Sequence, residues 1–301
     1  MTFIDSIKSL GIRFLENVPT ERIRSIKAGG IAEAMIFPKT QQELFEVIKL
    51  CLNMQVPYKI LGGCSNTCFS DEGFSGILIS TKGLDRFEVT ADNFLFVECG
   101  ASLSQLIRSL ADRSISLSDR LFGIPGTVGG AIRNNSGAFG EEISRRFIDG
   151  CFFDPSNNKL ITLCHSDLAF EYRSSLLKKT DLVFVSGRFS IILSNREKIY
   201  RRISDSISYR RERHPTDPSL GSFFKRSSDC IPAEMIEKAG LKGFGIGDAA
   251  ISEKHSGFIV NKGNAKVCDI EKLACTVEAV IYEKTGIKLE REAEIIPPQD
   301  V

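Results

Sequence analysis

Residues 123–140 read GIPGTVGGAIRNNSGAFG, a stretch with six glycines, two adjacent asparagines and almost no charge. Glycine loses more backbone freedom on folding than any other residue, so this composition is costly. Pro125, Thr127 and Phe139 interrupt the glycines, and the stretch is therefore not a low-complexity linker. We expect something to lie very close to this backbone, and the nature of that group decides the fold.

Two nucleotide-binding fingerprints do not fit the stretch. A Rossmann turn requires G-x-G-x-x-G between a strand and a helix, whereas residues 123–130 give G-x-x-G-x-x-G-G with no clear helix after them. A phosphate loop requires G-x-x-x-x-G-K-[ST], which does not occur in the chain. Tight packing of a helix on a strand is an alternative explanation, but it accounts for Gly129 and Gly130 only.

A second glycine loop, LGGCSNTCFSDEG at residues 61–73, directly follows a predicted strand. Gly62 and Gly63 let the backbone turn and approach a ligand, while Ser65 and Asn66 add side-chain donors. Consecutive N–H groups in such a turn form an anion-binding concavity. Two loops of this kind, both poor in charge, favour one phosphate-bearing ligand held by backbone amides.

Length and charge limit the possible partners. The 301 residues predict two or three domains, with 42% hydrophobic and 26% charged residues as in ordinary globular proteins. A net charge of +1 gives no electrostatic reason to expect a nucleic acid or a membrane as partner. The N-terminal MTFIDSIKSLGIRFLENV predicts a short amphipathic helix rather than a signal peptide, and no apolar run reaches the length of a membrane span. We therefore expect a cytoplasmic protein, and a monomer.

The nine cysteines are an odd number and include no C-x-x-C pair. Cys64 and Cys68 are separated by three residues, but no second pair of Cys or His ligands matches them, so no metal site is expected. Scattered cysteines without this spacing indicate reduced and mostly buried thiols.

Hydrophobic periodicity predicts helices and strands in a mixed order. Thr40 is a candidate N-cap, followed by a helix and then a strand within residues 38–61, and residues 101–114 form a second amphipathic helix. The residue pattern changes after Ser194, where a charged helical stretch precedes a predicted compact α+β region. We place boundaries near 80 and 195. The other predicted strands are GILIST, FLFVECG, KLITLCH, LVFVSGRFSIIL, GFIVN and LEREAEIIP.

The loops LGGCSN and GIPGTVGGAIRNNSGAFG resemble the flavin-binding loops of the UDP-N-acetylenolpyruvoylglucosamine reductase family. That family has the FAD-binding fold of vanillyl-alcohol oxidase and p-cresol methylhydroxylase. The resemblance continues, in the family's order, at residues 25–38, 171–178, 221–225, 240–263 and 286–296. It implies an α+β chain of the short type, with a two-part FAD-binding domain (1–80 and 81–195) and a C-terminal substrate domain (196–301).

The resemblance also implies a reaction, in which UDP-N-acetylglucosamine enolpyruvate is reduced to UDP-N-acetylmuramate with NADPH and FAD, a step of peptidoglycan precursor synthesis. Hydride adds to the vinyl carbon, and the charge left on the neighbouring carbon and carboxylate needs a cation and then a proton. The residues implied to contact the cofactor are Tyr58, Leu61, Gly62, Gly63, Cys64, Ser65, Asn66, Gly123, Ile124, Gly126, Thr127, Gly129, Asn135, Gly137 and Ala138.

Three residues are implied to be catalytic. Arg173 lies in EYRSS and would hold the substrate carboxylate in a bidentate fork. Ser222 lies in GSFFK and would donate the proton to the carbanion. Glu292 lies three residues after Leu289 in LEREAE, as the family's catalytic glutamate does, and a raised pKa would let it act as an acid. Glu290 and Glu294 share its strand face, so alternation alone leaves the choice among the three glutamates open.

Five further residues are implied to contact substrate: Tyr172, Lys225, Lys254, His255 and Asn261. A solvated lysine is the alternative for Lys225, and a packed or surface histidine is the alternative for His255.

The chain departs from the family pattern at Cys64, where a glycine is usual, and at Phe139, where the usual tyrosine hydroxyl is missing. Asn134 also replaces a methionine. Two other functions of the same fold were weighed, an FAD-linked oxidase and a catalytically silent flavin or nucleotide-sugar binding protein. The retained motifs around Arg173, Ser222 and Glu292 favour the reductase over both.

Overall fold

The computed structural model describes residues 2–23, 26–227 and 229–298. Its chain divides into two compact units, each assembled from three separate segments. The first unit consists of Met1–Leu15, Ala34–Gly63 and Gly76–Arg210. The second unit consists of Glu16–Glu33, Cys64–Ser75 and Arg211–Val301. The division of the sequence into 1–80, 81–195 and 196–301 stays a prediction.

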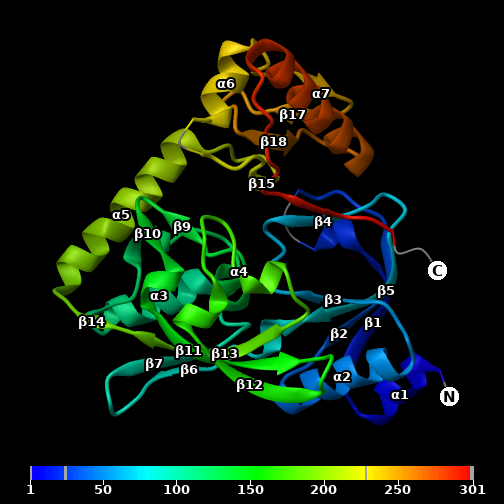
Figure 1. The fold of residues 1–301 in the computed structure, drawn as a ribbon, viewed down its shortest axis with the longest axis vertical. Coiled ribbons are helices and arrows are strands. Elements are labelled where there is room, and N and C mark those ends of the chain that lie inside the picture. The colour runs from blue at the N-terminus through cyan, green and yellow to red at the C-terminus, as the bar shows by residue number, and fades with distance from the viewer. Residues whose placement is uncertain (1, 24–25, 228, 299–301) are drawn as a thin grey trace. The chain divides into compact units, whose positions relative to one another are not determined.

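The N-terminal part of the chain forms two helices and a four-stranded sheet of order β1-β2-β5-β3. The helix α1 (Phe3–Ser9) begins at a capping box formed by Thr2 and Asp5. The helix α2 (Gln41–Asn53) begins at the predicted cap Thr40 and packs against α1 (Figure 1). β3 and β5 run parallel. The strands are β1 (Arg13–Pro19), β2 (Ile31–Phe37), β3 (Tyr58–Leu61) and β5 (Phe74–Ser80).

The rest of the first unit is built on a five-stranded antiparallel sheet of order β12-β11-β13-β7-β6. A cluster of phenylalanines from β11 and β13, with edge-on contacts of Phe147 to Phe184 and Phe189, forms its core. The strands are β6 (Phe87–Val89), β7 (Phe94–Glu98), β11 (Phe147–Asp154), β12 (Lys159–Cys164) and β13 (Val183–Ser190). Its helices are α3 (Leu103–Asp112) and α4 (Val128–Arg133). Two short antiparallel pairs are β8 (Ile115–Ser116) with β14 (Ile192–Leu193), and β9 (Gly137–Ala138) with β10 (Glu141–Glu142).

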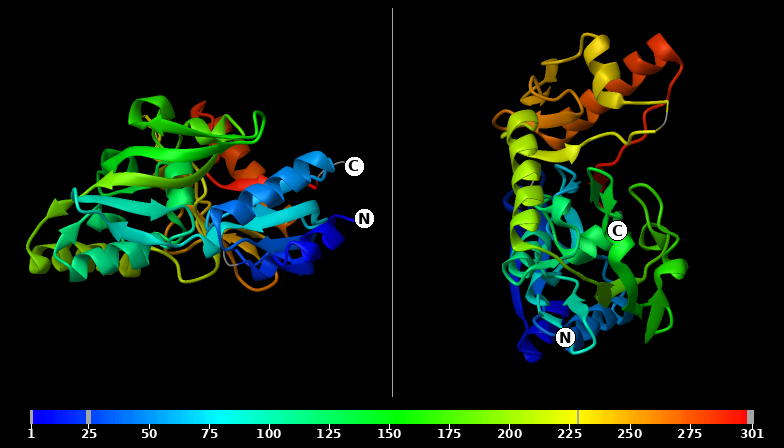
Figure 2. Two further views of the ribbon diagram at one scale, coloured as in Figure 1. Left: turned by 90° about the horizontal axis from the view of Figure 1, so that it is seen from below. Right: turned by 90° about the vertical axis from the view of Figure 1, so that its left-hand side faces the viewer.

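The helix α5 (Arg196–Arg213) is one continuous element (Figures 1 and 2). Its buried residues Ile199, Ile203 and Ser206 follow helical spacing and face the first unit's core.

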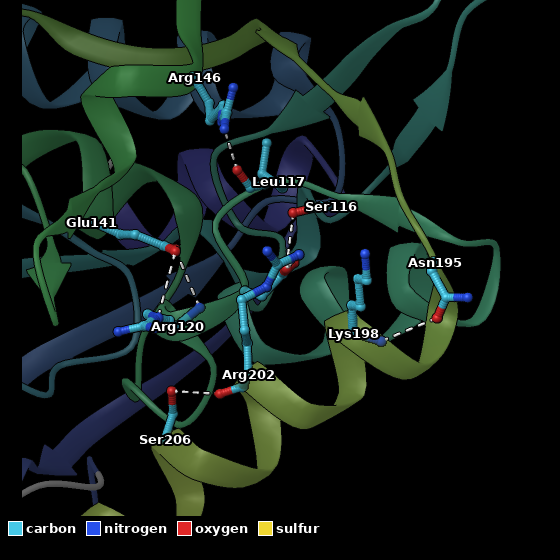
Figure 3. Close-up of polar contacts among 10 residues, drawn as sticks. Ser116, Leu117, Arg120, Glu141, Arg146, Asn195, Lys198, Arg202 and Ser206 are labelled. Atoms are coloured by element: carbon cyan, nitrogen blue, oxygen red, sulfur yellow. Dashed lines mark hydrogen bonds and ion pairs between the residues drawn. The ribbon is translucent and has the colours of Figure 1, made fainter.

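Arg202 fastens α5 to the segment that precedes the glycine stretch. Its guanidinium pairs at 2.7 Å with the buried Asp119, which also accepts a 2.8 Å hydrogen bond from Ser116. The same segment is also linked to β10, since the Arg120 N–H donates to the Glu141 carboxylate at 3.2 Å (Figure 3).

The second unit contains a four-stranded sheet of order β15-β18-β17-β16 and a parallel pair, β4 with β19. Asp71 holds the start of α7, because its carboxylate accepts the N–H groups of Val267 and Cys268 at 2.9 and 2.8 Å. The strands are β4 (Thr67–Phe69), β15 (Ser219–Ser222), β16 (Gly245–Ile246), β17 (Ala249–Ile251), β18 (Phe258–Asn261) and β19 (Glu294–Ile296). The helices are α6 (Pro232–Lys238) and α7 (Val267–Thr285).

Most predicted elements are confirmed, and three details were wrong. The N-terminal helix ends at Ser9, and the second half of the predicted amphipathic segment is strand β1, because Gly11 turns the chain with φ +68. A short helix, α4 (Val128–Arg133), begins inside the stretch and contains Gly129 and Gly130, where the sequence indicated no clear helix. In LEREAEIIP only Glu294–Ile296 is a strand.

Several thiols are inert by burial, as expected from their spacing. Burial raises the pKa values of Cys51, Cys68 and Cys99 to about 12, so these thiols stay protonated at neutral pH. No helix in the described part of the chain is long and apolar enough to cross a bilayer.

Candidate active site

The two glycine loops meet inside the first unit. A Cβ added at Gly63 would lie 2.5 Å from the Cα of Gly126, and one added at Gly62 would lie 2.3 Å from Oγ1 of Thr127. Real Cβ atoms do not approach other atoms so closely, so both positions require glycine. The chain therefore brings the ends of two distant sequence motifs into direct contact.

Backbone donors gather where the loops meet. Among the described residues, the N–H groups of Gly62, Gly63 and Gly126 donate to no carbonyl. The Thr127 hydroxyl next to them caps α4 by accepting from the N–H of Gly130 at 3.4 Å. Adjacent unpaired N–H groups attract anionic oxygens, which is the chemistry that the sequence predicts for these loops.

Some glycines of the stretch are explained by the protein's own packing. A Cβ at Gly129 would lie 3.0 Å from the Cys99 carbonyl oxygen, and one at Gly137 would lie 2.8 Å from Cγ of Glu142. A Cβ at Gly130 would meet nothing closer than 3.8 Å. Packing within the protein therefore explains why glycine is needed at 129 and 137, but not at 130. The sequence predicted that packing would explain Gly129 and Gly130 only.

Hydrogen bonds of Asn135 and Arg173 connect the end of the glycine stretch to the segment that contains Arg173, the predicted cation. The Asn135 amide donates to the Glu171 carbonyl at 3.0 Å and accepts the Ser144 N–H at 3.4 Å. Arg173 donates to the Gly137 carbonyl at 2.9 Å. Asn135 and Arg173 have φ values of +42 and +56, a left-handed conformation that costs energy in residues other than glycine. Strain of this kind is concentrated at functional sites.

Tyr172 lies beside Arg173, whose guanidinium is 4.9 Å from the centre of the tyrosine ring. A cation held over an aromatic face is stabilised by the ring quadrupole. The tyrosine is exposed, with 43% of its surface accessible, whereas Arg173 is half-buried.

Most of the other first-unit residues that are predicted to contact the cofactor lie on β3 or at the start of the glycine stretch. Burial raises the pKa of Tyr58 to about 12, and the Leu61 carbonyl accepts a hydrogen bond from Thr81 at 3.1 Å. The Ser104 hydroxyl accepts the Gly123 N–H at 3.1 Å and donates to the Ile124 carbonyl at 3.4 Å. Ala138 lies on β9.

The second unit holds Cys64, Ser65 and Asn66. Cys64 is 8% exposed and has φ +51, which explains why glycine suits this position better. The Asn66 amide donates to the Glu292 carbonyl at 2.8 Å, and the Asn66 carbonyl accepts the Glu294 N–H at 2.9 Å. Asn66 therefore fixes the backbone of the predicted catalytic glutamate, a role that its sequence position did not indicate.

Ser222 and Glu292 lie on neighbouring backbones of the second unit. The N–H of Glu292 donates to the carbonyl of Phe223 at 2.8 Å. Gly221, with φ +80, breaks the register of β15 immediately before Ser222, which faces Phe258 of β18. Long-range pairing thus brings the predicted proton donor and the predicted acid to adjacent positions.

Glu290 has a charged partner in the second unit. Glu290 forms an ion pair with Lys225, and the Lys225 N–H also donates to the Glu290 carbonyl at 2.8 Å. Arg291 points to the opposite side and clamps Glu278 of α7 with two hydrogen bonds of 2.6 and 2.9 Å. The ion pair therefore gives both Lys225 and Glu290 a structural role. The contact of Lys225 with substrate stays a prediction.

Three other predicted substrate contacts have partners within the second unit. The Lys254 ammonium donates to the Arg211 carbonyl at 2.6 Å. Burial lowers the pKa of His255, whose Nδ1 accepts the Gly257 N–H at 3.1 Å. The Asn261 amide donates to Ile26 and Lys27 and accepts from Gly263 and Ala265, with all four distances between 2.9 and 3.2 Å.

These bonds use the full hydrogen-bonding capacity of the Asn261 side chain, which is 3% exposed. They assign it a structural role, and its contact with substrate stays a prediction. In the described part of the chain, no group of three or more His, Cys, Asp or Glu side chains is arranged to hold a metal ion.

Sequence reasoning missed Arg210. Arg210 comes four residues after Ser206 and continues the buried face of α5. In the described part of the chain, its Nε and Nη2 atoms are buried without a hydrogen-bond partner. The sequence signal is a charged residue that continues an apolar stripe. Five other arginines in the same helix obscured it.

Comparisons with known proteins identify the family and the fold. Residues 213–296 match the C-terminal domain of UDP-N-acetylenolpyruvoylglucosamine reductase, and residues 32–152 match an FAD binding domain. The UDP-N-acetylenolpyruvoylglucosamine reductase of Caldicellulosiruptor bescii is 38% identical over 299 residues, covering 98% of this chain and 95% of that protein. That of Caldanaerobacter subterraneus is 34% identical and covers 93% of this chain and 92% of that protein.

A solved structure is also similar. The crystal structure of UDP-N-acetylenolpyruvylglucosamine reductase from Thermus caldophilus superposes with a TM-score of 0.81 at 28% identity, covering 95% of this chain and 99% of that one. The predicted fold class, an FAD-binding domain followed by a C-terminal α+β domain, is confirmed by these matches.

Proposed function

The chain belongs to the UDP-N-acetylenolpyruvoylglucosamine reductase family, and we propose that it reduces UDP-N-acetylglucosamine enolpyruvate to UDP-N-acetylmuramate, with FAD bound and NADPH as reductant. This reaction is a step of peptidoglycan precursor synthesis. The family match extends over nearly the whole of both chains, which supports carrying over the whole activity rather than one domain's share of it.

The observation that carries the cofactor assignment is the contact between the two glycine loops. The free N–H groups of Gly62, Gly63 and Gly126 converge in a part of the chain that matches an FAD binding domain. Their chemistry fits the diphosphate of FAD, whose anionic oxygens accept hydrogen bonds. FAD, when bound, supplies the group that takes hydride from NADPH and passes it to the vinyl carbon.

Arg173 is the residue that we assign to the substrate carboxylate. Its guanidinium presents a planar fork of donors that matches a carboxylate, and it stays charged throughout the reaction. A cation held there beforehand stabilises the negative charge that develops when the vinyl carbon accepts hydride. The hydrogen bond to Gly137 and the contact with Tyr172 support this role by restricting the side chain.

Ser222 is the residue that we assign to proton donation. The carbanion next to the carboxylate is a strong base, and a hydroxyl within reach can protonate it. Glu292 would act beside Ser222 as an acid or as a hydrogen-bond partner of the substrate. The backbone hydrogen bond from Glu292 to Phe223 supports a shared site, because it keeps the two segments in fixed register.

Substrate and setting follow from the same activity. The proposed partner is a small nucleotide sugar, and we propose that the enzyme works as a monomer in the cytoplasm, where nucleotide-activated sugars are made. Light scattering of the purified protein tests the oligomeric state.

The function is tested by the visible spectrum and by NADPH oxidation. A yellow protein that oxidises NADPH only when UDP-N-acetylglucosamine enolpyruvate is present supports the proposal. A protein that stays colourless after incubation with FAD contradicts it. NADPH oxidation that consumes oxygen and ignores the nucleotide sugar would instead indicate an oxidase of the same fold.

A further inference from the structure

Arg173 lies at the tip of a tight turn in the first unit. Glu171 and Ser174 exchange backbone hydrogen bonds of 3.1 Å in both directions, which leaves Tyr172 and Arg173 between them. Arg173 has φ +56, and strain of this kind persists only where the surrounding structure fixes the backbone. Glu171 and Tyr172 are exposed, so packing against the core does not hold this part of the turn. Hydrogen bonds from another segment have to hold it.

The buried side chain of Asn135 supplies such a hydrogen bond. Its amide donates to the Glu171 carbonyl at 3.0 Å, and the same carbonyl accepts the N–H of Ser174. Both lone pairs of that carbonyl are therefore used. Asn135 is 1% exposed, and its own side-chain oxygen accepts the N–H of the buried Ser144 at 3.4 Å. A buried amide thus ties the base of the turn to the interior of the first unit.

Further hydrogen bonds join the end of the glycine stretch to the turn and to the residues after it. The buried Ser175 hydroxyl donates to the Arg133 carbonyl at 2.9 Å, and the Arg133 guanidinium donates to the Leu177 carbonyl. Arg173 itself donates to the Gly137 carbonyl at 2.9 Å. Donors come from both segments, so neither segment can shift without breaking bonds to the other. The orientation of Arg173 therefore depends on the end of the glycine stretch.

We propose that Asn135 is a positioning residue of the reductase reaction, which fixes the turn so that the Arg173 guanidinium is presented to the substrate carboxylate. The inference rests on the proposed function for the role of Arg173. A catalytic group displaced by about 1 Å can lose about 10²-fold in rate, so an amide that acts only through another residue still has a measurable effect. The family resemblance instead implies a contact of Asn135 with the cofactor, and the two roles predict different losses.

The neighbouring asparagine provides a matched control. The Asn134 amide donates to the Gly130 carbonyl at 3.0 Å, within the end of α4. Asn135→Gly removes the bonds to Glu171 and Ser144, and glycine adopts φ +42 without strain. Asn134→Gly makes the same change one residue earlier. Neither variant introduces a charge that would itself attract or repel the substrate carboxylate.

Two ligands distinguish the carboxylate from the rest of the substrate. UDP-N-acetylglucosamine enolpyruvate carries the carboxylate, and UDP-N-acetylglucosamine lacks it. The Kd of each for the oxidised holoenzyme is measured from the flavin spectrum, without reductant. Weakened charge-assisted hydrogen bonds of Arg173 predict that Asn135→Gly raises the Kd of the enolpyruvate about tenfold and that of UDP-N-acetylglucosamine less than about twofold, whereas Asn134→Gly changes neither. A rise for the enolpyruvate that does not exceed the rise for UDP-N-acetylglucosamine overturns the proposal.

The Kd of FAD for the flavin-free protein, from quenching of flavin fluorescence, tests the other role. A positioning residue predicts the same FAD affinity for Asn135→Gly and Asn134→Gly. If Asn135→Gly weakens FAD binding and both nucleotide sugars lose affinity equally, Asn135 contacts the cofactor and the proposal is overturned. Equal losses for the two nucleotide sugars with FAD affinity intact also overturn it, because a general disturbance of the site does not act through Arg173.

Arg173→Lys shows whether Asn135 acts through Arg173. Residues that act together give non-additive effects when both are changed. Once position 173 holds the substituted side chain, Asn135→Gly should therefore change the Kd of the enolpyruvate by a much smaller factor than it does in the wild type. The same factor in both backgrounds overturns the proposal.

Thermal unfolding of each variant shows whether it is folded. If Asn135→Gly does not fold, Ser175→Ala decides, because it removes another bond between the two segments. It should raise the Kd of the enolpyruvate more than that of UDP-N-acetylglucosamine, with Ser174→Ala as the control. Equal values for the two serine variants overturn the proposal.

Failure of the proposed function gives a different result. A wild-type protein that binds no FAD contradicts the function itself. An Arg173→Lys variant that binds the enolpyruvate as tightly as the wild type contradicts the role of Arg173 in that function. A wild-type protein with FAD and substrate-dependent turnover, whose Asn135→Gly variant behaves like Asn134→Gly, contradicts only the role of Asn135.

Discussion

The glycine loops of the first unit and the Ser222 segment of the second unit are two ways of building a site. In the loops the proposed function is carried by backbone N–H groups, and the side chains are absent so that Gly62 and Gly63 can touch Thr127 and Gly126. Around Ser222 the proposed function is carried by side chains, and the backbone is their scaffold. The first region is therefore sensitive to any added atom, whereas the second is sensitive to the loss of one particular group.

The largest effect is expected from Ser222→Ala. General acid catalysis contributes about 10²- to 10⁴-fold to a rate, so turnover of the substrate should fall by that factor. Reduction of the flavin by NADPH should remain, because no proton from Ser222 is needed there. Stopped-flow absorbance separates the two half-reactions. Ser219→Ala on the same strand is the control, and turnover of Ser222→Ala near the wild-type value would refute the assignment.

Gly63→Ala tests the loops. The new Cβ would lie 2.5 Å from the Cα of Gly126, so one of the two backbones must shift. Overpacking of this kind costs about 1–3 kcal/mol, and we expect FAD affinity to fall between about fivefold and a hundredfold. Titration of the flavin-free protein measures it.

Gly130→Ala is the matched control for that experiment, because its Cβ would meet nothing closer than 3.8 Å. The comparison of the two regions fails if Gly63→Ala and Gly130→Ala bind FAD equally well.

Cys64→Gly should be stabilising. Cys64 has φ +51, and a non-glycine residue in this conformation is strained by about 1 kcal/mol. Removing the side chain also frees the unfolded chain, so the net gain in the free energy of unfolding should be about 0.5 kcal/mol. Urea denaturation measures it. Cys64→Ala keeps the strain and should show no gain, and an equal gain from both variants would attribute the effect to the thiol instead.

The smallest effect concerns His255. Burial comes first among the causes that lower its pKa below the ordinary 6.5, and the charges of Arg226 and Arg213 act in the same direction. Below pH 6.5 the unfolded chain therefore binds a proton that the folded chain resists, and stability is lost as the pH falls toward the lowered folded-state pKa.

His255→Asn keeps an acceptor for the Gly257 N–H and removes this titration. The free energy of unfolding should then fall less steeply between about pH 6.5 and 5, as urea denaturation at several pH values would show. His165→Asn, at an exposed position, is the control for the same substitution elsewhere in the chain. An unchanged slope for His255→Asn would show that another group causes the loss.

The local elements and the site motifs could be predicted because their signals lie close together in the chain. Thr40 caps α2 as expected, since the N-cap preference depends on a side chain and an N–H three residues apart. For the two glycine loops the sequence predicted one shared phosphate-bearing ligand, and the direct contact between the loops is a finding of the structure.

The partners of individual polar side chains could not be predicted. Asn261 has the residue type of a substrate ligand, but the fold surrounds it with four backbone groups of the second unit. Glu290 and Glu292 are equivalent by alternation, and the sequence did not indicate that Glu290 forms an ion pair with Lys225.

The sequence by itself determined the family, the fold class and the segments that carry the chemistry, because glycine spacing and short motifs are properties of neighbouring residues. The tertiary structure alone decided that Glu292 binds the backbone next to Ser222, and that two guanidinium nitrogens of Arg210 are buried. The physical reason is that burial and hydrogen-bond partners depend on residues far apart in the chain. An arginine in a charged helix looks like its neighbours until the fold shows which face is covered.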